Sequence, residues 1–163
     1  MNGLKIYLDT SFVISLADSF DTFHNQSVDF IEKLTKRNIE RHVGAPLIVE
    51  LGKIVETKET ERCLQILDTI ENFGIYFNDI DMKDVWNLSQ IYLDTNVLAV
   101  RHRLDLFHYS AASLLNCTHL ASWNKKHFND KIAMSVNKIN AKQGLLSLIV
   151  GSPTYIIRRE KIA

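Results

Sequence analysis

Leu4-Lys5-Ile6-Tyr7-Leu8-Asp9-Thr10-Ser11 is the stretch that decides the fold, because it predicts a compact strand that ends on an acidic residue. Asp9 or Thr10 can cap a short helix that follows. Apolar runs of strand length recur at residues 42–44, 75–77, 119–122 and 145–149. Stretches with helical spacing separate them, at residues 24–37, 46–56, 59–72, 82–97, 103–116 and 131–142. This alternation predicts an α/β domain with a central, mainly parallel sheet of four to five strands covered on both faces.

The composition is that of an ordinary globular domain. The chain has 163 residues, of which 46% are apolar and 23% charged, enough for one domain with a real core. Nineteen basic residues balance nineteen acidic ones, so any affinity for nucleic acid must come from local patches or from the site itself. Cys63 and Cys117 lie in apolar segments without metal-type spacing, which predicts reduced core thiols.

The ends of the chain carry two further expectations. No apolar run approaches the ~20 residues of a membrane span, and the first residues lack the pattern of a signal peptide. We therefore expect no membrane association and a cytoplasmic protein. We assign residues 1–152 to the domain, and we expect residues 153–163, with Arg158, Arg159 and Lys161, to form a loosely docked or frayed tail.

Three acidic residues fall where sites form in open parallel sheets, beyond the carboxyl ends of the strands. Asp9 ends the first strand, Glu50 shares a helix face with Leu47 and Ile54, and Asp105 opens the 103–116 helix. Each has a structural alternative. Asp9 can cap a helix, the head of Glu50 can reach water from a packed stem, and the dipole of a helix start favours Asp105 whatever its function.

The combination of these acids favours a metal site. Two unit charges ~4 Å apart repel by about 4 kcal/mol at an effective dielectric constant near 20. Three clustered carboxylates would therefore need protonation or a cation. Mg²⁺ and Mn²⁺ prefer oxygen ligands and keep several waters, so a few carboxylates suffice to bind them.

Other polar and aromatic residues surround the predicted site. Ser122-Trp123-Asn124 follows the fourth strand and points into the same crevice as Asp9, although Asn124 also suits a plain turn. His108 and His127 are interpreted as structural histidines that could also contact substrate. Arg101, Arg103, Lys125 and Lys126 could hold phosphates or could be ordinary surface residues. Trp86 and Trp123 could stack on bases, and for Trp86 we expect core packing instead.

These residues, in this order, resemble the PIN-domain nucleases, in particular the VapC-type toxins of prokaryotic toxin–antitoxin pairs. The resemblance runs from Ile6-Tyr7-Leu8-Asp9-Thr10-Ser11 through the Glu50 helix to Arg103-Leu104-Asp105-Leu106-Phe107-His108. It continues into Leu120-Ala121-Ser122-Trp123-Asn124-Lys125-Lys126-His127-Phe128 and Ser152-Pro153, and so spans nearly the whole chain.

The resemblance implies a PIN-like three-layer α/β/α fold and a ribonuclease that depends on Mg²⁺ or Mn²⁺. It implies that Asp9, Glu50 and Asp105 bind the metal and that Asn124 occupies the position of a fourth catalytic acid. Asn124 thus removes one negative charge, which bears on whether one ion or two bind. For substrate binding we expect Ser11, Arg103 and Lys125. The implied partners are RNA, a small cognate antitoxin and a second copy of the chain in a homodimer.

Two other functions are weighed against an active ribonuclease. Because Asn124 replaces an acid, the chain could be a catalytically weak or inactive PIN-like module that binds RNA or protein without cutting. A phosphatase or transferase on a similar sheet is disfavoured, because Ser11 stands where aspartyl-phosphate enzymes place a second acid. The sequence also lacks a Gly-x-x-x-x-Gly-Lys-Ser/Thr phosphate loop.

Overall fold

The structure, a computed structural model, describes residues 3–56 and 59–162. A five-stranded parallel sheet forms its centre, with the strand order β3-β2-β1-β4-β5. The strands are β1 (Lys5–Leu8), β2 (Glu40–Gly44), β3 (Tyr76–Asn78), β4 (His119–Ala121) and β5 (Ile149–Gly151). The predicted mainly parallel sheet is thereby confirmed.

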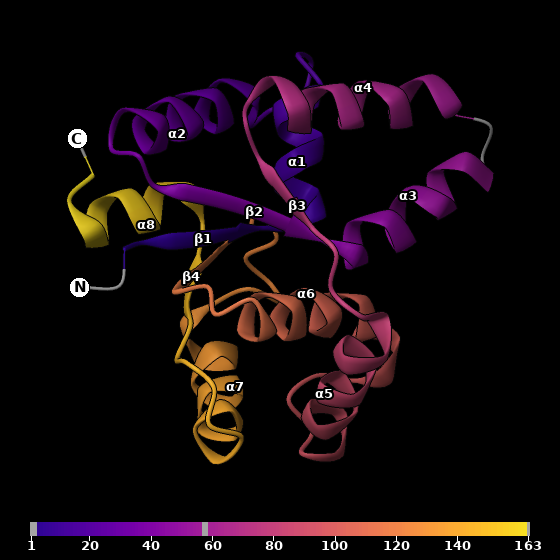
Figure 1. The fold of residues 1–163 in the computed structure, drawn as a ribbon, viewed down its shortest axis with the longest axis vertical. Helices are drawn as coiled ribbons and strands as arrows, with labels where there is room; N and C mark the ends of the chain where they lie inside the picture. The colour runs from indigo at the N-terminus through magenta and orange to yellow at the C-terminus, as the bar shows by residue number, and fades with distance from the viewer. Residues whose placement is uncertain (1–2, 57–58, 163) are drawn as a thin grey trace.

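Eight helices and one short 3-10 turn connect and cover these strands. They are α1 (Thr10–Ala17), α2 (His24–Lys36), α3 (Ala45–Glu56), α4 (Thr60–Asn72), α5 (Met82–Asp94), η1 (Val100–His102), α6 (Arg103–Leu114), α7 (Asp130–Lys142) and α8 (Pro153–Glu160). Helices α1, α2 and α4 lie on one side of the sheet, and α5, α6 and α7 lie on the other (Figure 1). The molecule is a three-layer α/β/α sandwich.

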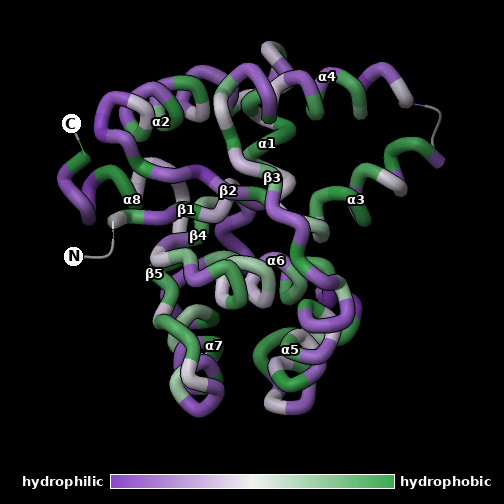
Figure 2. Tube along the Cα trace, viewed as in Figure 1, coloured by the Kyte–Doolittle hydropathy of each residue, from purple (hydrophilic) through white to green (hydrophobic). Residues whose placement is uncertain are grey.

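The alternation of side chains along the strands explains the two layers. Ile6 and Leu8 point into a core shared with α1, α2, α3, α4 and α8. Tyr7, between them, points the other way, into a core shared with α5, α6 and α7. In the outer helices the apolar positions recur at helical spacing, which gives α2 and α4 their alternating polar and apolar colours (Figure 2).

The final segment differs from the loosely docked or frayed tail that the sequence predicted. Ser152 caps the start of α8 by accepting a hydrogen bond from Tyr155 N, and Pro153 suits the first helical turn. Ile156 and Ile162 are buried in the core of the α1 and α2 layer. The charged residues Arg158, Arg159 and Lys161 concealed this apolar face in the sequence.

The last strand also begins later than the predicted 145–149. The side chain of Asn137 on α7 accepts from Leu148 N at 2.8 Å and donates to Leu148 O at 2.9 Å. These bonds hold residue 148 against α7, so pairing with β4 starts only at Ile149. Cys63 and Cys117 are buried free thiols, as predicted. Within residues 3–56 and 59–162, no helix is both long enough and apolar enough to cross a bilayer.

Candidate active site

Asp9 is the buried acid at the carboxyl end of β1. Its side chain caps α1 by accepting from Phe12 N at 2.9 Å. Ser11 donates to both carboxylate oxygens at 2.9 Å, and Ser122, just beyond β4, donates to Oδ2 at 2.6 Å. The predicted capping role and the predicted proximity of the 122–124 segment are therefore both correct.

Burial makes the ionised form of Asp9 unfavourable. The side chain is almost fully buried, and this burial raises the pKa of the carboxyl above its ordinary value. The charge of His108 and the hydrogen bonds from Ser122 and Phe12 lower the pKa without cancelling that effect. A cation beside Asp9 would favour the carboxylate.

Glu50 reaches the same region from α3. Its Oε2 lies 3.0 Å from Nε2 of His108, a buried residue of α6. Burial alone would raise the pKa of Glu50, but the hydrogen bond and the charge of His108 outweigh it, so the pKa is lowered. Glu50 is thus held ionised at the junction of α3 and α6.

His108 contacts β1 and the start of α1 as well as Glu50. Its Nδ1 lies 3.1 Å from the Tyr7 hydroxyl on β1, and its Nε2 also lies 3.2 Å from Thr10 Oγ1 at the start of α1. Burial lowers the pKa of His108, but its hydrogen bond to Glu50 and the charges of all three predicted acids, Glu50, Asp9 and Asp105, raise it above the ordinary value. The three acids therefore share one electrostatic environment around this ring.

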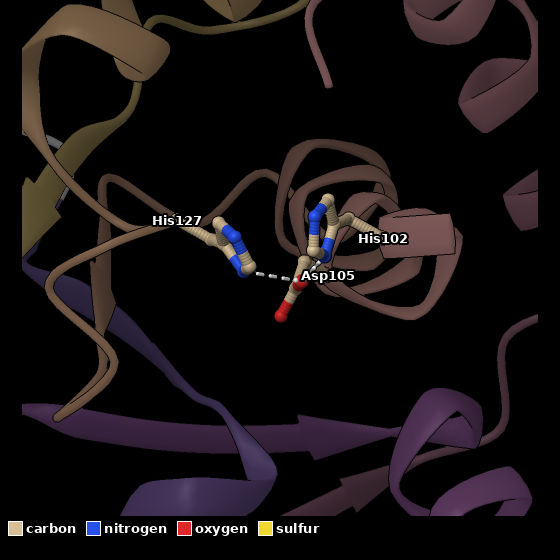
Figure 3. Close-up of side chains that lie close together, drawn as sticks. All are labelled: His102, Asp105 and His127. Carbon is tan, nitrogen blue, oxygen red and sulfur yellow. Dashed lines mark ion pairs between the residues drawn. The ribbon is translucent and has the colours of Figure 1, made fainter. Parts of the chain in front are cut away.

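Asp105 lies in the first turn of α6, as predicted. Small and buried residues, Ser110, Ala111 and Ala112 among them, let that helix pack closely. Asp105 Oδ2 lies 2.8 Å from His127 Nδ1 and 3.9 Å from His102 Nδ1 (Figure 3). Burial raises the pKa of Asp105, the charge of His127 lowers it, and Glu50 adds to the increase.

The three acids are not arranged as ligands of a single ion. Among the described residues, one group of three metal-ligating side chains has all its ligand atoms within 4.8 Å of one another, and it is His102, Asp105 and His127. Asp9, Glu50 and Asp105 do not meet this distance together. Their carboxylate oxygens are nonetheless the kind of ligand that a hard divalent cation prefers.

The remaining predicted site residues have distinct environments. Asn124 follows Ser122, donates its backbone N–H to Ser122 Oγ at 3.0 Å, and places its amide nitrogen 3.4 Å from His127 Nδ1. Lys125 is exposed beside it. Arg103 stacks over Trp86, 4.0 Å from the ring centroid, and donates to Gln90.

The two tryptophans differ from expectation. Trp86, predicted to pack in the core, is 48% exposed and carries Arg103 on its ring. Trp123 instead stacks on Phe23 with ring centroids 4.3 Å apart and donates to Ser27 Oγ. Trp86 is therefore the tryptophan with a surface available to a ligand.

The histidines are the part of the site that the sequence reasoning underestimated. His108 and His127, which we predict to be structural, each contact an acid, and so does His102, for which the sequence pattern yields no prediction. Its place three residues before Asp105, at a helix start, was the available signal.

Comparisons with known proteins address the fold. No known protein family matches the sequence, and no curated protein does either. Among solved structures, the chain is similar to one chain of VapBC2 from Rickettsia felis. That crystal structure contains VapBC2 bound to a DNA fragment from its own promoter. The two chains share 18% sequence identity and a TM-score of 0.57, over 76% of this chain and 90% of that chain. The fold is PIN-like. At this identity the likeness concerns the fold alone.

Proposed function

We propose that this chain is a divalent-metal-dependent endoribonuclease that hydrolyses RNA phosphodiester bonds. The observation that carries the proposal is that His108 Nε2 contacts both Glu50 Oε2 on α3 and Thr10 Oγ1, the neighbour of Asp9 at the end of β1. Asp105 lies three residues before His108 on α6. Ligand and catalytic sites of open α/β sheets form beyond the carboxyl ends of the strands. Asp9 and Asp105, both with raised pKa values, are the acids that gain most from a bound cation.

Asp9, Glu50 and Asp105 would hold the ion, which we expect to be Mg²⁺ or Mn²⁺. Bound there, such an ion supplies charge stabilisation at a phosphoryl oxygen and lowers the pKa of an attacking water. The chain's own residues orient the ligands. Ser11 and Ser122 fix the Asp9 carboxylate through their hydroxyls.

The histidines then act as positioning residues for the acids. His108 holds Glu50 and offsets part of the negative charge, and His127 holds Oδ2 of Asp105. Asn124 would contribute an amide oxygen near the same ion in place of a fourth acid. With three carboxylates instead of four, we expect weaker occupancy of a second ion.

RNA phosphates would be held beside the acids by basic residues. Lys125 and Lys126 are exposed in the loop that follows β4, next to Asn124. Arg103 would act from its fixed position over Trp86, where the exposed indole can also stack on a base. Ser11 would help orient a ligand or a phosphate.

By analogy with the VapBC2 complex, we infer that the chain is the toxin of a prokaryotic toxin–antitoxin pair. A small antitoxin that covers the acidic site, a homodimer and a cytoplasmic location belong to this proposal. A short reading frame for a DNA-binding-type protein beside the gene would support it.

A second candidate is a PIN-like module that binds RNA or protein without cutting it. Two observations favour it. Asn124 stands in place of an acid, and His108 and His127 already supply partners for Glu50 and Asp105 without a metal. This candidate predicts RNA binding without turnover at every metal concentration.

Cleavage of a labelled RNA separates the two candidates. The wild-type chain should cleave with Mg²⁺ or Mn²⁺, and a chelator should stop the reaction. Asp9→Asn should lower the rate by about 100-fold or more, equivalent to about 2.7 kcal/mol of activation free energy. Asp68→Asn, an exposed acid on α4, is the matched control and should cleave as the wild type does. Equal cleavage by Asp9→Asn would point to a contaminating nuclease and refute the proposal.

A further inference from the structure

His102, Asp105 and His127 form a compact group of two imidazoles and one carboxylate. The residues come from η1, the first turn of α6 and the loop after β4. Figure 3 shows both rings directed at the same carboxylate. The ring centroids of the two histidines are 4.0 Å apart, and their planes meet at 51°.

The distances in this group suit a small ion. Two nitrogen or oxygen ligands on a tetrahedral ion lie about 3.4 Å apart when each bond is about 2.1 Å long. Asp105 Oδ2 lies 2.8 Å from His127 Nδ1 and 3.9 Å from His102 Nδ1. These two distances bracket the required one, and the ligand atoms of all three residues lie within 4.8 Å of one another.

Metals bind the neutral form of an imidazole. His102 Nδ1 lies 3.9 Å from Asp105 Oδ2. His102 Nε2 accepts a hydrogen bond from Arg101 Nε, so the proton of the neutral ring is on Nδ1, facing Asp105. An ion bound at Nδ1 would replace that proton. The hydrogen bond from the exposed Arg101 side chain to Nε2 would then break.

We propose that His102, Asp105 and His127 bind a borderline transition-metal ion, with Zn²⁺ or Co²⁺ preferred over Mg²⁺. Imidazole nitrogens suit Zn²⁺ and its neighbours, whereas Mg²⁺ prefers oxygen ligands alone. Three protein ligands leave a fourth position open for water or a phosphate oxygen, as in catalytic zinc sites. Both histidine contacts are with Oδ2 of Asp105.

This proposal rests on the proposed function only through the shared residue Asp105, because the binding of the ion is measured without RNA. The experiment is isothermal titration of the untagged, metal-free chain with Zn²⁺ and, separately, with Mg²⁺. Co²⁺ absorption provides a second readout, since its visible spectrum reports nitrogen ligation. We expect one Zn²⁺ per chain and much weaker binding of Mg²⁺.

Substitutions locate the site. His102→Gln and His127→Gln should each weaken Zn²⁺ binding by about 100-fold or more, since loss of an outer partner alone costs ~10–100-fold. His24→Gln is the matched control, because it removes a histidine of α2 whose ring contacts Ser15 O on α1. It should bind Zn²⁺ as the wild type does.

Two outcomes would overturn the proposal. One is unchanged Zn²⁺ affinity and Co²⁺ absorption in both His102→Gln and His127→Gln. The other is the absence of Zn²⁺ binding by the folded wild-type chain. RNA cleavage by the same samples is a separate result. Absence of Zn²⁺ binding by a wild-type chain that still cleaves RNA with Mg²⁺ would refute this site and leave the nuclease proposal intact.

Discussion

Glu50 Oε2 lies 3.0 Å from His108 Nε2, and this pair joins α3 to α6 at the edge of the sheet where the strands end. Neither residue would be expected to occupy such a place for packing alone, because ionisable groups are rarely buried without a partner. His108 is buried, while the Glu50 side chain keeps 25% of its exposure. Because Glu50 keeps part of its hydration, the pair has a smaller desolvation penalty than a fully buried ion pair would, and the coupling between the two residues can be measured.

A double-mutant cycle with His108→Gln and Glu50→Gln should give a coupling free energy of about 1–2 kcal/mol. The measurement is urea unfolding of the four proteins in the presence of a chelator. The exposed pair Lys33–Asp29 on α2, 2.8 Å apart, is the control and should give below about 0.5 kcal/mol. Additivity within about 0.5 kcal/mol for His108 and Glu50 would show that the two side chains do not interact.

Asp9→Asn should stabilise the metal-free chain while it removes activity. Burial raises the pKa of Asp9, so without a cation the folded state loses stability as the pH rises through that pKa. Asparagine can still cap α1 and carries no charge. The thermal midpoint in a chelator at pH 7 should therefore be higher for Asp9→Asn than for the wild type.

Adding Mn²⁺ should reverse this order. An ion that binds only the folded state adds about 2.7 kcal/mol at 100 times its dissociation constant. The wild type should gain this stability and Asp9→Asn should not. Equal gains in both proteins would mean that Asp9 does not bind the ion.

His42 should make the fold acid-sensitive. Burial lowers the pKa of His42 despite its 3.0 Å contact with Glu40. The side-chain contacts with Glu40 and with Asn78, whose Nδ2 lies 2.8 Å from His42 Nδ1, raise the pKa without cancelling the effect of burial. Because the unfolded chain binds this proton more readily, the free energy of unfolding should fall as the pH drops below about 6.5.

Urea unfolding at several values between pH 5 and 8 checks this dependence. The slope should be smaller in His42→Gln than in the wild type, since glutamine does not titrate. Parallel curves for the wild type and His42→Gln would contradict the assignment.

The docking of α8 should depend on Gly151. A Cβ at this position would overlap the ring of Tyr155. Gly151→Ala should therefore lower the free energy of unfolding by about 1–3 kcal/mol. Adding Tyr155→Leu should restore part of that loss by removing the ring. No destabilisation by Gly151→Ala would mean that α8 is not held against β5 as described.

Local patterns in the sequence predicted most of the fold. Apolar runs and helical spacing placed the strands through β4 and the helices through α7 within a few residues. The predicted range of the last strand was wrong because Asn137 on α7 binds the backbone of Leu148, a contact that no local sequence pattern indicates. The prediction for the final segment missed helix α8, because the charged residues between Ile156 and Ile162 suggested a loosely docked tail.

The candidate site was predicted less completely. Because Asp9 and Ser122 follow the ends of two predicted parallel strands, the sequence predicts that they lie close together. In the structure Ser122 Oγ donates a hydrogen bond of 2.6 Å to Asp9 Oδ2. The contacts of His108 and His127 with acids on other segments could not be inferred, because they depend on how α3, α6 and the loop after β4 pack. The metal ligands themselves stay a prediction.

The most direct test of the central claim, that Asp9, Glu50 and Asp105 together bind a divalent ion, is an anomalous difference map from crystals soaked in Mn²⁺. The account predicts a peak within bonding distance of the Asp9 and Asp105 carboxylates, with Glu50 turned toward it. A map without a peak at any of these three acids, at a Mn²⁺ concentration that supports RNA cleavage, would contradict it.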